Sequence, residues 1–131
     1  MKKKGVTLIE TIVSLMILML VVTLFLTIVK EYNTNLHARK VKERLSRLSY
    51  CIMNELKYNC TKENIISQSS NNKIQLKNYD DILDDLKYKS LFELEKGDGI
   101  TVLFNNNEAL EINVTIYEDG FTEERNFIKW R

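Results

Sequence analysis

The chain opens with one long apolar run, which is the strongest feature of its hydrophobic pattern. Between Glu10 and Lys30 lie nineteen residues with no charge and no proline. As a helix they would extend about 29 Å at roughly 1.5 Å per residue, which is close to the hydrocarbon thickness of a bilayer. The pattern therefore predicts a membrane-spanning helix over residues 6–29.

The charges that flank this run predict its orientation. Lys2, Lys3 and Lys4 precede it, and Lys30 alone follows it. Because cationic flanks stay on the cytoplasmic side, we expect a cytoplasmic N-terminus and an extracytoplasmic domain at residues 30–131. An ordinary secretory signal is the alternative, since it also combines a basic and an apolar region. That alternative needs a small-x-small cleavage site after the run, and the sequence offers none there.

Beyond Lys30 the apolar residues recur at spacings of three and four, which predicts an amphipathic stem helix to about residue 58. The residues that share this face are Ala38, Val41, Leu45, Leu48, Ile52 and Leu56. We expect the face to pack on the protein's own sheet, and a coiled coil with another subunit is the alternative. Lys40, Arg44 and Arg47 are expected on the opposite side of the helix, which they make basic.

The next part of the chain has a weaker pattern. Residues 59–72 are rich in Asn, Ser, Thr and Gln, which predicts a connecting loop. Residues 73–77 alternate between apolar and polar side chains, as a short strand does. Residues 80–94 carry an apolar pattern suited to a short helix or an irregular cover.

The C-terminal part predicts a small antiparallel sheet over about residues 99–130. Its segments rich in β-forming residues are 100–104, 109–117 and 122–130. Asp119-Gly120 is a hairpin signal between the last two segments. Together with the long helix, these strands predict an α+β fold in which a meander packs on the stem.

Glu10 stands at the start of the apolar run, where a carboxylate is unfavourable unless it has a specific role. An ionised side chain deep in the bilayer costs about 2.5 to 3.5 kcal/mol by insertion scales. Thr7 and Glu10 have the S/T-x-x-E spacing of a capping box, in which each side chain binds a backbone amide at the start of a helix. The alternative is that Glu10 awaits a cationic partner on another chain. The spacing is compatible with both roles.

The segment around Glu10 resembles a known signal. Lys4-Gly5-Val6-Thr7-Leu8-Ile9-Glu10, with basic residues before it and a membrane-length helix after it, resembles the class III signal of type IV prepilins and pseudopilins. In that family a membrane aspartic peptidase cuts after the glycine and methylates the new N-terminus. The resemblance implies a leader of residues 1–5, cleavage between Gly5 and Val6, and N-methylation of Val6.

The resemblance also implies an assembly mode and a set of partners. Glu10 of one subunit would pair with the Val6 amine of its neighbour. The partners would be other pilin or pseudopilin subunits, the prepilin peptidase, and an assembly platform with its ATPase. The chain would lie in the cell membrane and later in a fibre of a type IV pilus, a competence pseudopilus or a type II secretion pseudopilus. The lack of proline in the helix resembles minor pilins and pseudopilins more than major pilins.

Residues that could carry chemistry are few. His37 has no Cys, Asp or Glu at metal-ligand spacing, so we interpret it as a surface residue. Cys51 and Cys60 would lie about 13.5 Å apart on a continuous helix, so a disulfide between them requires the helix to end before Cys60. We expect no metal, no cofactor and no enzymatic activity. A single-pass membrane protein whose outer domain binds a ligand or partner is the alternative function.

Charge is divided unevenly along the extracytoplasmic part. Residues 30–62 contain eight basic and three acidic residues, whereas residues 63–131 contain eight basic and fourteen acidic residues. A basic stem and an acidic head could help subunits to stack, although each exposed pair contributes little. Contact between nucleic acid and Lys40, Arg44 and Arg47 is expected only if the chain serves DNA uptake.

Overall fold

The computed structural model describes residues 3–106 and 109–130, with side chains from residue 7 onward in these ranges. The chain forms two compact units, Met1–Arg39 and Lys40–Arg131. Helix α1 (Lys3–Asn54) accounts for all described residues of the first unit and ends within the second. The expected long N-terminal helix is therefore confirmed.

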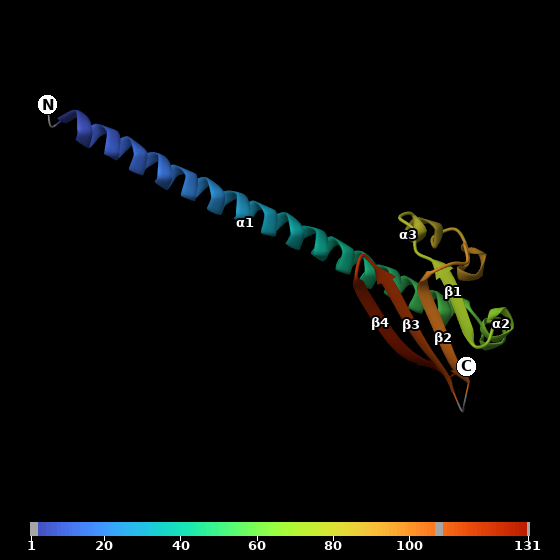
Figure 1. Cartoon of the computed structure of the whole chain (residues 1–131). Helices are drawn as coiled ribbons and strands as arrows, with labels where there is room; N and C mark the ends of the chain where they lie inside the picture. The colour runs from blue at the N-terminus through green and yellow to red at the C-terminus, as the bar shows by residue number, and fades with distance from the viewer. Residues whose placement is uncertain (1–2, 107–108, 131) are drawn as a thin grey trace. The chain divides into compact units, whose positions relative to one another are not determined.

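The second unit combines the end of α1 with a four-stranded sheet (Figure 1). After α1 come a π-helical turn (Glu55–Asn59), α2 (Lys62–Gln68), β1 (Lys73–Lys77), α3 (Ile82–Asp85), a 3-10 turn (Leu91–Glu93), β2 (Gly99–Asn106), β3 (Leu110–Glu118) and β4 (Phe121–Lys129). The strands lie in the order β1-β2-β3-β4, and each pairs antiparallel with the next. This is the meander expected from the sequence, and the fold is α+β.

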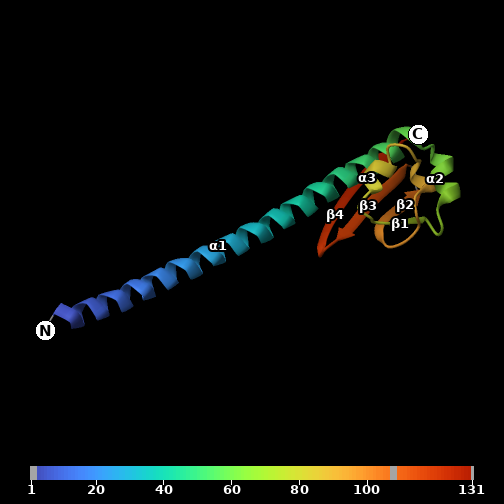
Figure 2. The ribbon, with the colours of Figure 1, turned by 90° about the horizontal axis from the view of Figure 1, so that it is seen from above.

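The sheet buries one face against residues 40–54 of α1, which run along it (Figure 2). Alternate residues of each strand point to this inner face, because side chains alternate along a strand. The stem contributes Val41, Leu45, Leu48 and Ile52, and the sheet contributes Ile74, Leu76, Ile100, Val102, Phe104, Leu110, Ile112, Val114 and Ile116. The predicted packing of the stem's apolar face on the protein's own sheet is confirmed for these residues.

The helical stretch continues to Asn59 through the π-helical turn, close to the expected end of the stem. The prediction of a loop over residues 59–72 is wrong, because α2 lies within it. Thr61 is the N-cap of α2, and its hydroxyl oxygen accepts a hydrogen bond from the Asn64 amide at 3.3 Å. Ile65 is fully buried and fixes the short helix to the core. The polar composition of the segment concealed this one apolar anchor.

Two tight turns depend on residues that tolerate positive φ. Asp119 and Gly120 have φ values of 49° and 80° and join β3 to β4, which confirms the predicted hairpin. Gly99 has a φ of 117° at the start of β2. A Cβ atom added there would lie 2.7 Å from the Cβ of Asn78, so this position requires glycine for space as well as for conformation.

We expect Gly99→Ala to lower the free energy of unfolding by about 2 to 3 kcal/mol, because strained φ and a steric clash act together. Gly120→Ala is the matched control, since its φ is also positive but no atom lies within 4 Å of the added Cβ. The control should lose only about 1 kcal/mol. Urea unfolding of the two variants measures the difference, and equal losses would contradict the role of the contact with Asn78.

Candidate functional site

The first candidate region is the apolar part of α1, which no other described part of the chain covers. Every residue from Thr7 to Asn35 is exposed. The large apolar side chains of residues 8–29 have exposed fractions between 39% at Val29 and 71% at Met19. Within the described residues, one helix is long and apolar enough to cross a membrane, and it contains this segment. A surface of this kind requires lipid or other apolar helices around it.

The hydroxyl groups of the segment are satisfied within the helix itself. Thr11, Ser14, Thr23 and Thr27 each donate to a backbone carbonyl three or four residues earlier, at 2.8 to 3.0 Å. Such bonds hide the hydroxyls from the surroundings. The segment therefore presents no hydroxyl that would need water, which suits it to a hydrocarbon environment.

Glu10 is the single charged residue of this segment, and its side chain is exposed. Its backbone carbonyl accepts the hydrogen bond of Ser14 at 2.8 Å. Its carboxylate makes no ion pair with any side chain that the structure describes. The carboxylate is therefore available to a group outside the described part of the chain.

The other residues predicted for this region lie in the same helix. Because α1 begins at Lys3, Thr7 lies inside the helix of the full-length chain and not at its N-cap. Gly5 and Val6 belong to the first turns of α1, and the side chain of Val6 lies outside the described part. A capping role for Thr7 thus applies only to a shorter chain whose helix begins near Val6.

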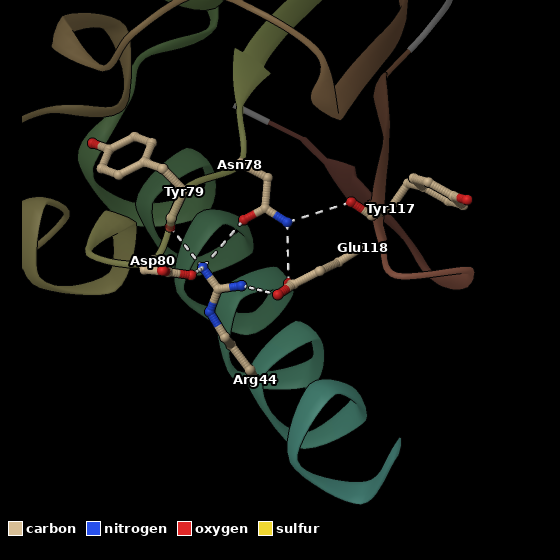
Figure 3. Close-up of polar contacts among 6 residues, drawn as sticks. All are labelled: Arg44, Asn78, Tyr79, Asp80, Tyr117 and Glu118. Atoms are coloured by element: carbon tan, nitrogen blue, oxygen red, sulfur yellow. Dashed lines mark hydrogen bonds and ion pairs between the residues drawn. The ribbon is translucent and has the colours of Figure 1, made fainter. Parts of the chain in front are cut away.

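The second candidate region is the contact between the stem and the far end of the sheet, centred on Arg44 (Figure 3). The guanidinium donates to the carboxylate of Glu118 and to the carbonyl oxygen of Tyr79, the latter at 2.6 Å. Asn78 completes the cluster, since its amide donates to Glu118 at 3.2 Å and to the Tyr117 carbonyl at 3.3 Å. Asp80 lies 3.9 Å from the guanidinium but is fully exposed. One arginine thus joins the stem to two segments of the head.

This arrangement corrects the expectation that Arg44 lies on the solvent side with Lys40 and Arg47. Arg44 follows Val41 by three residues and precedes Leu48 by four, so it flanks the buried face of the helix. Its side chain is 21% exposed, whereas that of Arg47 is 70% exposed and pairs with Glu43 at 2.6 Å. Lys40 is exposed as expected.

The opposite end of the stem is closed by Lys129, which the sequence did not single out. Its ammonium group is buried and donates to the backbone carbonyls of Leu56 at 2.6 Å, Lys57 at 3.0 Å and Cys60. These carbonyls belong to the end of the helical stretch, where partners are otherwise missing. Burial lowers the pKa of Lys129. The sequence feature that could have identified Lys129 is its spacing of two from Phe127, which places both residues on the inner face of β4.

The remaining candidate residues are spread over the second unit and α1. Cys51 is exposed and Cys60 is buried, and both are free thiols. Burial raises the pKa of the Cys60 thiol. A bridge between the two cysteines stays a prediction. His37 is exposed on α1, and the described residues contain no group of three potential metal ligands.

Comparison with known families identifies the N-terminal segment. Residues 1–26 match the model described as the prokaryotic N-terminal methylation motif, which is the class III signal of type IV prepilins. The resemblance noted in the sequence is therefore confirmed for this segment, and the α+β arrangement behind it is pilin-like. No curated protein and no solved structure matches the chain.

We expect Arg44→Met to lower the free energy of unfolding by about 2 kcal/mol, because Glu118 and the Tyr79 carbonyl lose a charged donor. Arg47→Met is the control, since its exposed pair with Glu43 should contribute about 0.5 kcal/mol or less. Chemical unfolding followed by circular dichroism measures both variants. Equal effects would show that Arg44 has no special role at this contact.

A second prediction concerns alkaline pH. The Tyr79 hydroxyl donates to Asp85 at 2.5 Å, and this hydrogen bond, with burial, raises the pKa of Tyr79 to about 12. An unfolded tyrosine titrates near pH 10, so between pH 10 and 12 the unfolded state loses a proton that the folded state keeps. The free energy of unfolding should therefore fall with rising pH in this window. Tyr79→Phe should fall less steeply than the unmodified protein, and parallel curves would contradict the assignment.

Proposed function

We propose that this chain is a structural subunit of a type IV pilus-like fibre and is not an enzyme. The observation that carries the proposal is the methylation motif at residues 1–26, followed by an uncovered apolar helix with Glu10 as its one charge. An ordinary membrane anchor does not need this order of features. The fibre could be a type IV pilus, a competence pseudopilus or a type II secretion pseudopilus.

The processing step follows from the motif. The prepilin peptidase would cut between Gly5 and Val6 on the cytoplasmic side and methylate the Val6 amine. Removal of Lys2, Lys3 and Lys4 would take away the cations that hold the N-terminus in the cytoplasm. The subunit would wait in the membrane with residues 30–131 outside, and then move into the fibre with the help of the assembly platform and its ATPase.

The assembly step depends on the single carboxylate of the helix. Cleavage leaves one new amine at Val6, and Glu10 of a neighbouring subunit supplies one carboxylate to match it. Apolar helix surfaces pack on one another without a defined register, whereas a charge pair in a low-dielectric layer defines one. In the mature chain the helix would begin near Val6, so Thr7 could also cap it before assembly.

Nucleic acid is a weaker candidate partner. Arg44 is engaged by Glu118, and Arg47 pairs with Glu43, so Lys40 alone of the three predicted contacts has no such ion pair in the described residues. A phosphate-binding surface uses several exposed cations together. We therefore do not include DNA binding in the proposal.

The mature N-terminus tests processing directly. Intact mass and N-terminal sequencing of the protein from its own cells should find residues 1–5 removed and a methyl group on Val6. Gly5→Leu should remain uncut, whereas the control Gly5→Ala keeps a small residue and should be cut. An intact Met1 in the unmodified protein, or cleavage beyond Val29, would instead favour a single-pass membrane protein or a secreted one.

The role of Glu10 is tested by Glu10→Gln, with Glu31→Gln just beyond the apolar run as the control. If Glu10 pairs with a neighbour's amine, its loss leaves an unmatched buried charge and costs about 3 to 5 kcal/mol per contact. The Glu10 variant should be cut and inserted normally but be scarce in sheared fibres, while the Glu31 variant incorporates normally. Equal incorporation would reduce Glu10 to a helix cap with Thr7.

A further inference from the structure

The two edge strands of the sheet differ in how far their outward backbone groups are hydrogen-bonded, and most of those of β1 have partners. Ser70 and Lys73 exchange two backbone hydrogen bonds of 3.1 Å, and the Lys77 amide donates to the Glu95 carbonyl at 2.9 Å. Because backbone groups alternate in direction along an antiparallel strand, Gln75 also points away from β2. It is the one outward residue of β1 without a backbone partner in the described residues. The edge is thus covered at both ends.

The β4 edge is open along most of its length. The Phe104 amide donates to the Asn72 carbonyl, so the backbone groups of residue 104 point away from β3. Backbone groups alternate in direction along each antiparallel strand, and the register of the pairs carries this alternation from β2 through β3 to β4. The alternation places the backbone groups of Thr122, Glu124, Asn126 and Ile128 on the outer edge. None of the described residues forms a hydrogen bond with these groups.

Two of the features that protect edge strands, a bulge and a proline, are absent from β4. The register with β3 is continuous from Phe121 to Lys129, so no bulge twists the edge away. The inner face of β4 carries three charged side chains, but these are engaged within the chain. Arg125 pairs with Glu123 at 3.3 Å and donates to Ser46 at 2.9 Å, and Lys129 binds the carbonyls at the end of the stem. Phe121 and Phe127 on the inner face are half-buried and pack against the core, which leaves part of each ring uncovered. A long edge of this kind is a template for another strand.

A second copy of the chain does not fit this edge. The stem runs along β4, since Lys42 lies over Phe121, Ser46 bonds Arg125, and the Leu56 carbonyl bonds Lys129. An antiparallel pair of β4 strands would therefore reverse one stem relative to the other. Copies in one membrane or one polar fibre share a direction, a condition that rests on the proposed function.

The other ways to pair two copies also fail. The β1 strand of a second copy has the direction needed to pair antiparallel with β4, but Ser70 and Glu95 cover its ends. If two β4 strands paired in parallel, the inner face of one sheet would lie on the same side as the outer face of the other. This pairing would place the phenylalanines of one copy beside Thr122 and Asn126 of the other, where they stay uncovered.

We propose that β4 accepts an extended segment from a different subunit of the same fibre as a fifth strand. The segment carries apolar side chains beside Phe121 and beside Phe127, where they complete the half-covered core on either side of the Glu123–Arg125 pair. On the other face it carries a basic side chain beside Glu124, the only charge on the outer face of β4. Asn113 donates to Glu124 at 2.6 Å and holds the carboxylate in place.

Proline at an outward position tests the proposal in the full-length protein. Asn126→Pro removes an outward amide of β4 that forms no bond in the subunit, and Gln75→Pro makes the same change on the covered β1 edge. Both variants should fold and be cut after Gly5, because proline is tolerated at outward positions of edge strands. Incorporation into sheared fibres should fall about tenfold or more for Asn126→Pro, as expected for a lost strand contact, and stay unchanged for Gln75→Pro. Equal incorporation, or loss in both variants, would overturn the proposal.

Hydrogen exchange of the unmodified protein gives a second measurement. The amides of Thr122, Glu124, Asn126 and Ile128 should exchange freely in the detergent-solubilised subunit and at least about tenfold more slowly in the fibre. Unchanged exchange in fibres that contain the chain would overturn the fifth strand and leave the proposed function intact. A disulfide-linked homodimer of Asn126→Cys, made with Cys51→Ser, would overturn the choice of a different subunit. Absence of the unmodified chain from fibres would overturn the proposed function, and this inference with it.

Discussion

An apolar helix that the protein does not cover is the constraint on which the rest of the molecule depends. Full burial of one large apolar side chain contributes about 1.5 to 3 kcal/mol. The summed contribution of residues 8–29 therefore exceeds the typical free energy of unfolding of a domain, about 5 to 15 kcal/mol. The segment must therefore lie in lipid or among similar helices. Transfer between these two environments costs little, because lipid chains are as apolar as leucine. In the fibre that we propose, a subunit could thus leave the membrane for a helical bundle without facing water.

The second unit uses the same helix in a different way. From Val41 onward one side of α1 is buried by the sheet, and a cation closes each end of the contact. Arg44 joins the stem to Glu118 and Tyr79 near the start, and Lys129 binds the carbonyls at the end. The apolar face between them supplies most of the stabilisation, whereas the two cations determine which segments of the head meet the stem. The head is thereby fixed to the last part of α1.

Periodicity predicted the parts of this fold that one face defines. The spacing from Val41 to Ile52 identified the buried side of the stem, alternation identified β1, and the content of β-forming residues between turn signals identified β2, β3 and β4. Two features could not be derived in the same way. The helix α2 depends on one buried isoleucine in a polar segment, and Arg44 was assigned from its charge although its position flanks the core. The position of a polar residue beside a buried face depends on its tertiary contacts, and the pattern of residues along the sequence does not contain that information.

The N-terminal residues were predicted from a motif, and the structure adds their surroundings. Glu10 lies at the start of an apolar segment whose described threonine and serine hydroxyls bond to their own backbone, so its carboxylate is the charged group of residues 8–29 that can take an outside partner. The cleavage and methylation positions that we propose, Gly5 and Val6, would be recognised by a peptidase. No internal contact of the folded subunit could reveal them.

The position of Lys129 has a consequence for the order in which the chain becomes structured. The carbonyls at the end of the stem receive their cap from a residue 73 positions further along the sequence. During synthesis the stem is therefore made long before the residue that closes it, and the second unit cannot reach its final form until β4 has been added. A chain interrupted before β4 would keep an anchored helix with an open end and a three-stranded sheet beside it. Such a product would lack the contacts that close the helix, and proteases would attack it more readily than the complete chain.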